Sequence, residues 1–369
     1  MKERVQEIFG KIEAKLQAEC LRVGDQIPYI PENGRYTDMR ETNLQFWTNG
    51  FWAGMLWQMY HATGNELYQD TARHTEEAFD KALDDFITLH HDVGFMWLHS
   101  AVADYRLTGN EKSRVRGLHA ANLLAGRYNP AGKFIRAWNL DRTGWMIVDC
   151  LMNIPILHWA AKELDDPRFT YIANQHADTA LGEVLRGDGS CHHIVAFDPN
   201  DGTVLEHPVG QGYASGSSWS RGQAWAIYGF ALSYVHTGDI RYLEGAKKVA
   251  HYFISNVSLT GYVSLCDFRA PAEPVIWDTT ATAIAACGLL QIADLVPEFE
   301  KPLYYEHALK MLEALETKHC NWNVEEDGIV QMGTVLYGRK EDEHVPIIYG
   351  DYFFVEAILR LMGKSFLIW

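Results

Sequence analysis

The chain has 369 residues, of which 47% are hydrophobic and 22% are charged, a balance typical of a globular protein that buries a large core. The formal net charge of -16 argues against binding to nucleic acid or to anionic membrane surfaces. No apolar run approaches the ~18 residues that a membrane span needs, and the first residues form a charged amphipathic pattern, not a secretory signal. The six cysteines form no C-x-x-C pair, so we expect reduced thiols in a cytoplasmic protein.

A loose repeat organises the chain: an apolar helix, a short turn, and then a more polar helix. In chain order we predict the pairs 51–63 with 66–83, 95–108 with a helix to 127, 144–163 with a helix to 184, 220–237 with a helix to 256, and 278–295 with 304–317. The last apolar helix, 350–362, has nothing after it, and the N-terminal helix at 2–21 is its expected partner. A glycine that ends an apolar helix, followed by Asn or Asp, supplies a left-handed C-cap and then an N-cap.

This repeat predicts an all-α fold. Short turns make each pair an antiparallel hairpin, and the all-apolar helices must lie inside the amphipathic ones. Six hairpins that close on themselves give an (α/α)6 barrel, whereas an open solenoid would normally need polar capping repeats, which we do not find. The Gly/Pro-rich segments 186–218 and 257–276 predict long loops or hairpins. We therefore expect a single barrel domain over residues 1–369, with long loops at one mouth.

The stretch 144–161, GWMIVDCLMNIPILHWAA, is predicted to be a helix that is buried on every side. Its one carboxylate, Asp149, lies between Val148 and Cys150, where burial should raise its pKa. A carboxylic acid that stays protonated near neutral pH is what a general acid requires. The alternative is a structural aspartate bonded to a neighbouring backbone group or to Arg142, and this stretch alone does not decide between the two.

Inner helices that run the same way place their N-termini at one mouth of the barrel. The side chains there are the polar, ionisable and aromatic set that suits a sugar site: Trp47-Thr48-Asn49, His90-His91-Asp92, Asp149, Trp219-Ser220-Arg221, Asp278 and Asp351. Helix capping or structural support is the favoured interpretation of Asp278 and Asp351.

The loop LHHDVGF places Asp92 beside two histidines. It contains no H-E-x-x-H, no histidine pair at i and i+4 and no cysteine pair, so we expect no metal. A second carboxylate facing Asp149 is the preferred interpretation of Asp92, because two carboxyls in one pocket raise the pKa of one of them. An aspartate in a surface loop is the alternative.

The segment GSSWSRGQAWAIYGF predicts an aromatic wall and a guanidinium at a helix start, from Trp219, Arg221 and Trp225. Arginine suits bidentate recognition of a carboxylate. A buried arginine that pairs with Asp149 or Asp278 is the alternative. His193 and Gln211 lie in the preceding loop, and the pattern alone does not single them out.

Six segments together resemble one known family: WTNGFWAGMLWQMY, HHDVGF, VDCLMNIPILHWA, SSWSRGQAWAIYGFAL, DTTATAIAACGLLQIA and YGDYFFVEAILRL. In this order, over about residues 40–362, they look like the unsaturated glucuronyl hydrolases of glycoside hydrolase family 88. The resemblance implies an (α/α)6 barrel that removes the non-reducing-end 4,5-unsaturated uronic acid from oligosaccharides left by polysaccharide lyases. It also implies a glycosaminoglycan or similar acidic polysaccharide as the source, a cytoplasmic location, and no metal or other cofactor.

Position by position, the resemblance makes Asp149 the general acid/base and Asp92 the second essential carboxylate. It assigns substrate contacts to Trp47, Trp138, His193, Gln211, Trp219, Arg221 and Trp225. Two departures are Tyr349, where a tryptophan is expected before GDY, and Thr279-Thr280, which replace small serines. The loop 332–345 has no clear match, so the handling of sulfated sugars stays open.

The implied mechanism is hydration of the C4=C5 vinyl ether, with Asp149 as the proton donor and Asp92 as its supporting carboxylate. We expect a small acidic oligosaccharide as the partner, no nucleic acid or membrane, and a monomer or a weak homodimer. Three alternatives stay open: an unsaturated rhamnogalacturonyl hydrolase acting on pectin fragments, a sugar 2-epimerase that relies on paired histidines, and a non-catalytic carbohydrate-binding toroid.

Overall fold

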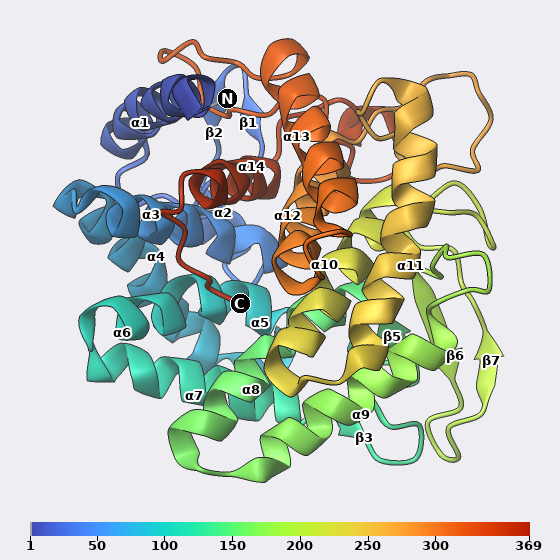
Figure 1. Cartoon of the computed structure of the whole chain (residues 1–369). Helices are drawn as coiled ribbons and strands as arrows, with labels where there is room; N and C mark the ends of the chain where they lie inside the picture. Colours follow the sequence, from blue (N-terminus) through green and yellow to red (C-terminus); the bar gives the residue numbers. More distant parts are fainter. Residues whose placement is uncertain (1) are drawn as a thin grey trace.

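The computed structural model describes residues 2–369, and its helices form a ring of hairpins (Figure 1). The inner helices are α3 (Gly50–Thr63), α5 (Val93–Trp97) continued by η3 (Leu98–Val102) and α6 (Ala103–Thr108), α8 (Pro155–Leu164), α10 (Ser220–Thr237), α12 (Thr279–Leu295) and α14 (Ile348–Leu361). Their outer partners are α4 (Glu66–Asp84), α7 (Glu111–Ala125), α9 (Pro167–Glu183), α11 (Ile240–Val257), α13 (Lys301–Lys318) and α1 (Lys2–Val23).

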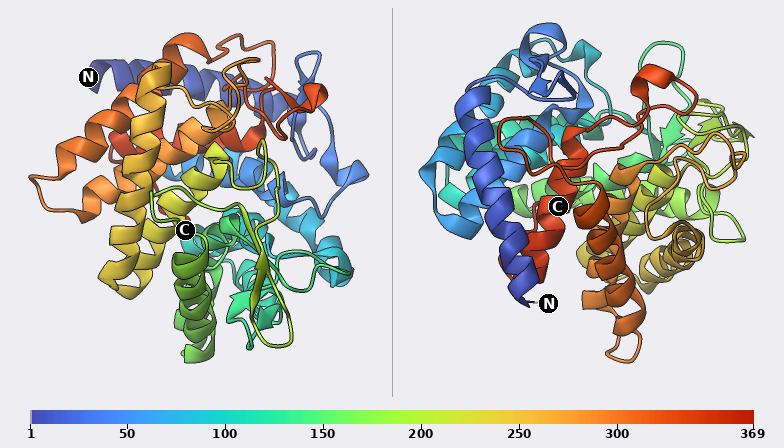
Figure 2. Two further views of the ribbon diagram at one scale, coloured as in Figure 1. Left: turned by 90° about the vertical axis from the view of Figure 1, so that its right-hand side faces the viewer. Right: turned by 90° about the horizontal axis from the view of Figure 1, so that it is seen from above.

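The apolar helices lie inside the ring because they have no polar face to expose. Residues 279–293 of α12 and 348–359 of α14 are all buried. Each inner helix packs on its outer partner, and α14 packs against α3, which closes the ring. The N-terminal α1 packs on α14, and Figure 2 shows the two side by side. The expected (α/α)6 barrel is thus confirmed, including the pairing of the first and last helices.

The turns of the hairpins follow the predicted chemistry. Three inner helices end at a glycine in the left-handed conformation: Gly64 (φ 71°), Gly109 (φ 76°) and Gly238 (φ 71°). The next residue then caps the outer helix through its side chain, as Asn65 does by accepting a hydrogen bond from the backbone N–H of Leu67. In the third hairpin Asp165 adopts the left-handed conformation and Asp166 caps α9.

The predicted continuous helix over residues 144–161 is wrong. Residues Trp145–Ile147 form strand β5, which pairs with β6 (Ile194–Phe197), and β6 pairs with β7 (Val204–Glu206). A 3-10 turn, η4 (Val148–Met152), follows β5, and α8 begins only at Pro155. Proline suits the first position of a helix but cannot donate the hydrogen bond that would join it to an earlier turn. Asp149 therefore lies in a strand-to-helix turn, where its side chain keeps 17% exposure.

The remaining elements are short and lie in the connections. They are β1 (Pro31–Glu32), β2 (Arg35–Tyr36), α2 (Met39–Thr42), η1 (Trp47–Asn49), η2 (Phe86–Thr88), β3 (Tyr128–Asn129), β4 (Phe134–Ile135), η5 (Ser258–Thr260) and η6 (Lys340–Asp342). The expected long loops are thus present, and the first of them holds the β6–β7 hairpin. No helix within residues 2–369 combines the length and apolarity that crossing a membrane requires.

The tail after α14 enters the barrel, which the sequence did not indicate. The buried Trp369 stacks on Phe353 with ring centroids 5.8 Å apart, and its Nε1 donates a hydrogen bond of 3.0 Å to Glu356 Oε2. Figure 1 shows the C-terminus among the inner helices. The tail thus contributes to the core of the barrel, where Trp369 also packs on Phe95 of α5 with centroids 6.0 Å apart.

Close packing in the ring predicts opposite effects for two glycine substitutions. A Cβ at Gly229 in α10 would lie 2.4 Å from Leu151 Cβ, whereas a Cβ at Gly10 in α1 meets nothing within 4 Å. We expect Gly229→Ala to lower the free energy of unfolding by ~1–3 kcal/mol. Gly10→Ala should raise it by up to about 1 kcal/mol because alanine favours helix. Urea unfolding followed by tryptophan fluorescence measures both, and equal effects would contradict tight packing at α10.

Candidate active site

A cavity of about 690 Å³ opens at the mouth where the inner helices begin. Its volume is in the range of small-ligand sites. All nine residues predicted for the site line it: Trp47, Asp92, Trp138, Asp149, His193, Gln211, Trp219, Arg221 and Trp225. Residues far apart in the chain are therefore brought together in one place, as the barrel topology requires.

Asp92 and Asp149 are linked through one imidazole. Nε2 of the buried His91 lies 3.4 Å from Asp92 Oδ2 and 3.4 Å from Asp149 Oδ1. Asp92 is the N-cap residue of α5, yet its side chain makes no capping hydrogen bond. Its carboxylate is therefore available to the cavity, and Asp92 is not the surface-loop aspartate considered as an alternative.

Asn153 also contacts both Asp92 and Asp149. Its Nδ2 donates to Asp92 Oδ1 and to the backbone oxygen of Asp149, both at 3.2 Å. Its Oδ1 accepts a 2.7 Å hydrogen bond from the backbone N–H of Phe95. A Cβ at Gly94 would lie 2.5 Å from Asn153 Cα, so only glycine allows α5 to approach this closely. The turn η4 and the start of α5 are thus held together at the carboxylates.

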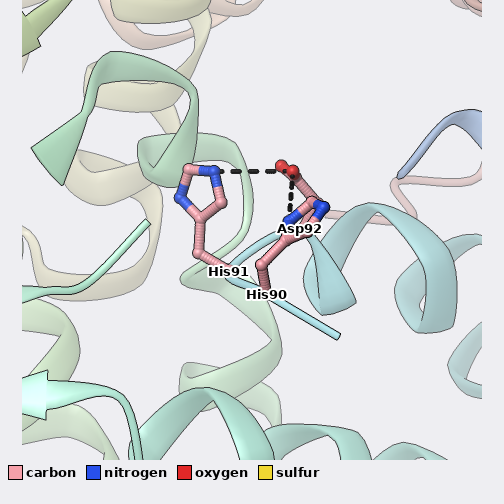
Figure 3. A group of neighbouring side chains, drawn as sticks. All are labelled: His90, His91 and Asp92. Carbon is pink, nitrogen blue, oxygen red and sulfur yellow. Dashed lines mark ion pairs between the residues drawn. The ribbon is translucent and has the colours of Figure 1, made fainter. Parts of the chain in front are cut away.

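The imidazoles of His90 and His91 lie on two sides of Asp92 (Figure 3). His90 Nδ1 lies 2.9 Å from Asp92 Oδ2. Within residues 2–369, these three side chains form the one group of histidines, cysteines and acids whose donor atoms lie within 4.8 Å of one another. Two imidazoles and a carboxylate are a set that first-row metals accept. The expected absence of a metal therefore stays a prediction that needs its own test.

The surroundings of the two carboxyl groups shift their pKa values in opposite directions. Burial raises the pKa of Asp149 well above its ordinary value, the charge of Asp92 raises it further, and Arg221 opposes both effects. At Asp92 burial acts in the same direction, but His91, His90 and the Asn153 amide outweigh it and leave the pKa below its usual value. Burial also lowers the pKa of His91 to about 4, so that its imidazole is neutral at pH 7. One carboxyl is therefore protonated and the other ionised.

Arg221 lines the cavity but is already paired. It is buried, and its Nη1 lies 2.6 Å from Asp278 Oδ2. Its two terminal nitrogens also donate to the backbone oxygens of Thr334 and Val335. The structural alternative, pairing with Asp278, is what the geometry shows. Arg221 thus anchors the loop 332–345 to α10, and this role is separate from a contact with substrate.

Asp278 and Asp351 both have structural roles, as expected. The side chain of Asp278 caps α12 by accepting from the backbone N–H of Thr280. Asp351 accepts hydrogen bonds from the backbone N–H groups of Ile329 and Val330, at 2.9 and 2.6 Å, and from Tyr36 Oη. Neither carboxylate lines the cavity.

Aromatic rings form much of the wall. Trp47 packs on Tyr349 with centroids 5.1 Å apart, Trp225 packs on Phe95 at 5.2 Å, and His193 packs on Trp219 at 4.0 Å. Tyr349 is itself fully buried and supports Trp47 from behind the wall. Gln211 joins this wall to the loop 332–345, because its Nε2 donates to the backbone oxygen of Val335 at 2.8 Å.

Sequence reasoning placed His90 and His91 at the mouth without giving them a role, and it assigned no site role to four further residues that the structure places here: Arg142, Trp145, Asn153 and Arg339. Two of these six residues had a usable signal. His91 is adjacent to Asp92, and Asn153 follows Asp149 by four residues, the spacing of one helical turn. The sequence suggested Arg142 only as a possible bonding partner of Asp149. The structure instead places its guanidinium over the rings of Trp138 and Trp145.

Comparison with known proteins gives a consistent match. The model of Glycosyl Hydrolase Family 88 matches residues 22–361. The unsaturated glucuronyl hydrolase of Bacillus sp. (strain GL1) is 37% identical over 352 residues, which cover 92% of each chain. The unsaturated chondroitin disaccharide hydrolase of Streptococcus pyogenes serotype M1 is 32% identical over 89% of this chain and 84% of its own. A crystal structure of the unsaturated glucuronyl hydrolase from Bacillus sp. GL1 has a TM-score of 0.92 at 34% identity and covers 97% of this chain and 96% of its own.

Asn153→Ala tests the link between the carboxylates. Loss of the amide removes one hydrogen bond from Asp92, so the pKa of Asp92 should rise, and the free energy of unfolding should fall by ~1–3 kcal/mol because the Phe95 N–H loses its partner. Carboxyl carbon NMR titration and urea unfolding measure the two effects. Asn122→Ala on the exposed side of α7 is the control, with a change of about 0.5 kcal/mol or less. An unchanged pKa of Asp92 would refute the role of Asn153.

Proposed function

The chain belongs to glycoside hydrolase family 88, and from that premise we propose that it removes the 4,5-unsaturated uronic acid from the non-reducing end of lyase-generated oligosaccharides of the glycosaminoglycan type. The observation that carries the proposal is the pair of carboxyl groups, both 3.4 Å from His91 Nε2, at the mouth of a cavity with aromatic walls, where the pKa of Asp149 is raised and that of Asp92 is lowered. We propose that the whole chain forms one catalytic domain. One hydrophobic cluster, which extends from Val5 to Trp369, supports that assignment.

The substrate has a C4=C5 double bond next to its ring oxygen, which makes it a vinyl ether. Asp149 donates its proton to C4, and the positive charge that forms at C5 is shared with the ring oxygen. Water then adds to C5 and gives its proton to the Asp149 carboxylate, which restores the acid. The resulting hemiketal opens, the bond to the neighbouring sugar breaks, and a 5-keto deoxyuronic acid is released. Carbon is a weak base, so an acid kept protonated by burial suits the first step.

The neighbours of Asp149 have supporting roles. Asp92 keeps its negative charge near the cation at C5 and, through His91, holds the carboxyl of Asp149 in place. We assign the uronate carboxylate to Arg221 and Gln211, which share the backbone oxygen of Val335 as a hydrogen-bond acceptor. We assign apolar contacts with the sugar to Trp47, Trp219 and Trp225, and Trp138 and His193 complete the wall.

Cell location, assembly and cofactors are also proposals. All six cysteines are free, which supports a reducing compartment and hence the cytoplasm. We propose a monomer or a weak homodimer. We also propose chemistry without a metal, because proton transfer from Asp149 and addition of water supply every step. Activity should then survive exhaustive treatment with a chelator, and loss that zinc or another divalent ion restores would assign His90, His91 and Asp92 to a metal.

The first test uses the unsaturated uronate's ultraviolet absorbance, which disappears when the double bond is hydrated. Wild type should remove the absorbance of chondroitin-lyase disaccharides, and Asp149→Asn should lower kcat by ~10²–10⁴-fold while the Kd for the disaccharide changes little. Loss of binding together with turnover would make Asp149 a structural residue. Turnover only of unsaturated rhamnogalacturonan disaccharides would indicate the pectin enzyme. A product of unchanged mass would indicate an epimerase, because hydrolysis adds water.

The raised pKa of Asp149 determines how kcat/KM should change with pH. Asp149 acts as an acid only while protonated, and burial and the charge of Asp92 raise its pKa. We therefore expect kcat/KM to stay high above the usual range of a carboxyl and to fall as pH rises through the raised pKa. Asp92→Asn removes one of the two causes, so the alkaline limb of the residual activity should move to lower pH. An alkaline limb that stays in place would assign it to a different group.

A further inference from the structure

Three arginines line the cavity, and two of them have their charge compensated. Arg221 pairs with Asp278 at 2.6 Å. Arg339, in the loop 332–345, has its Nε 2.9 Å from Glu341 Oε1 and 3.3 Å from Asp342 Oδ2. The cavity has no lysine among its lining residues. Each of these two arginines therefore already has a carboxylate partner for its charge, and Arg221 keeps its assigned contact with the uronate.

Arg142 is different, because within residues 2–369 its guanidinium forms no ion pair and donates no hydrogen bond. It is exposed and lies over the ring of Trp145, with Cζ 4.5 Å from the centroid, and 5.9 Å from the centroid of Trp138. Indole faces hold a guanidinium by cation–π attraction and leave its N–H groups free to bind an anion. The result is an uncompensated cation at the cavity wall of a protein with a net charge of -16.

The loop that carries Arg142 is held at its base. The half-buried guanidinium of Arg127 donates to the backbone oxygens of Ala137 and Trp138 and to Asn139 Oδ1. At the other end, Trp145 N donates to Arg142 O, and Trp145 itself belongs to strand β5. The backbone on both sides of Arg142 is thus held before any ligand arrives, which favours a built subsite over a mobile surface arginine.

A series of side-chain contacts leads outward from the carboxylates to Trp138 and Arg142. His90 Nδ1 lies 2.9 Å from Asp92, the ring of His90 packs on Trp138 with centroids 5.6 Å apart, and Trp138 lies under Arg142. Trp138 is 39% exposed, whereas Asp92 is buried. A uronate held at the carboxylates therefore leaves its neighbouring sugar beside Trp138 and Arg142.

We propose that Arg142, with Trp138 and Trp145, forms a subsite for a sulfate ester on the sugar to which the unsaturated uronate is attached. The indole of Trp138 stacks on that sugar, and the Arg142 guanidinium donates charge-assisted hydrogen bonds to the sulfate oxygens. Arg142 then determines specificity and takes no part in the chemical step. This inference rests on the proposed function for the position of the uronate.

The test compares saccharides that differ only in the sulfate. We would measure kcat/KM for unsulfated, 4-sulfated and 6-sulfated unsaturated chondroitin disaccharides with wild type, Arg142→Gln and Arg142→Lys. In Arg142→Gln the ratio of sulfated to unsulfated kcat/KM should fall about tenfold for at least one sulfate position, the usual size of one charge-assisted contact. Arg142→Lys should restore part of that ratio. Asp141→Asn, which changes the neighbouring charge outside the cavity, should not lower it.

Other outcomes would overturn the proposal. An equal loss with all three disaccharides would mean that Arg142 meets the uronate itself, and loss of the ratio in Arg339→Gln but not in Arg142→Gln would move the sulfate to the opposite loop. Kd values for the same saccharides, measured by calorimetry in the Asp149→Asn background, give a readout that does not need turnover. Turnover of the unsulfated disaccharide tests the proposed function separately, so failure of one proposal is distinguishable from failure of the other.

Discussion

The site depends on two carboxyl groups that share one buried place and cannot both ionise. Burial raises the pKa of each, so the environment must decide which one keeps its proton. Asp92 receives the amide of Asn153 and lies between two imidazoles, whereas Asp149 Oδ1 forms no hydrogen bond within residues 2–369 and lies 3.4 Å from His91 Nε2. This unequal supply of donors makes Asp92 the anion and leaves Asp149 the acid.

The barrel supplies the geometry that such a pair needs. Asp92 precedes α5 and Asp149 precedes α8, so the parallel course of the inner helices brings the two side chains to one mouth. The same topology brings Arg221, at the start of α10, to Asp278, at the start of α12, and their ion pair anchors the loop 332–345 over the cavity. Because each helix start is held by its neighbours in the ring, the carboxylates are positioned by packing and not by a flexible loop.

The sequence predicted the ring and both carboxylates, because those depend on local signals. Apolar composition separates inner from outer helices, and a Gly-Asn or Gly-Asp turn ends three of the inner ones. The error at 144–161 has a physical reason: periodicity does not distinguish a buried strand from a buried helix, and β5 exists only because β6, about fifty residues later, pairs with it. The contact of His91 with Asp149 likewise depends on a partner distant in the chain. For Arg221 the residues left two roles open, and only the contact with Asp278 shows which partner it has.

Charge compensation inside the cavity explains how so acidic a chain can receive an acidic sugar. Protonation removes the charge of Asp149, and Arg339 compensates Asp342, so Asp92 is the one negative charge among the lining residues that faces the ligand without a cationic partner. Its neighbours His90 and His91 shield it on two sides. At the rim an entering anion therefore meets Arg142, whose uncompensated charge opposes the net negative charge of the molecule locally. A buried acid kept neutral thus serves both the proton transfer and the approach of the substrate, since an ionised Asp149 would repel the uronate that it has to protonate.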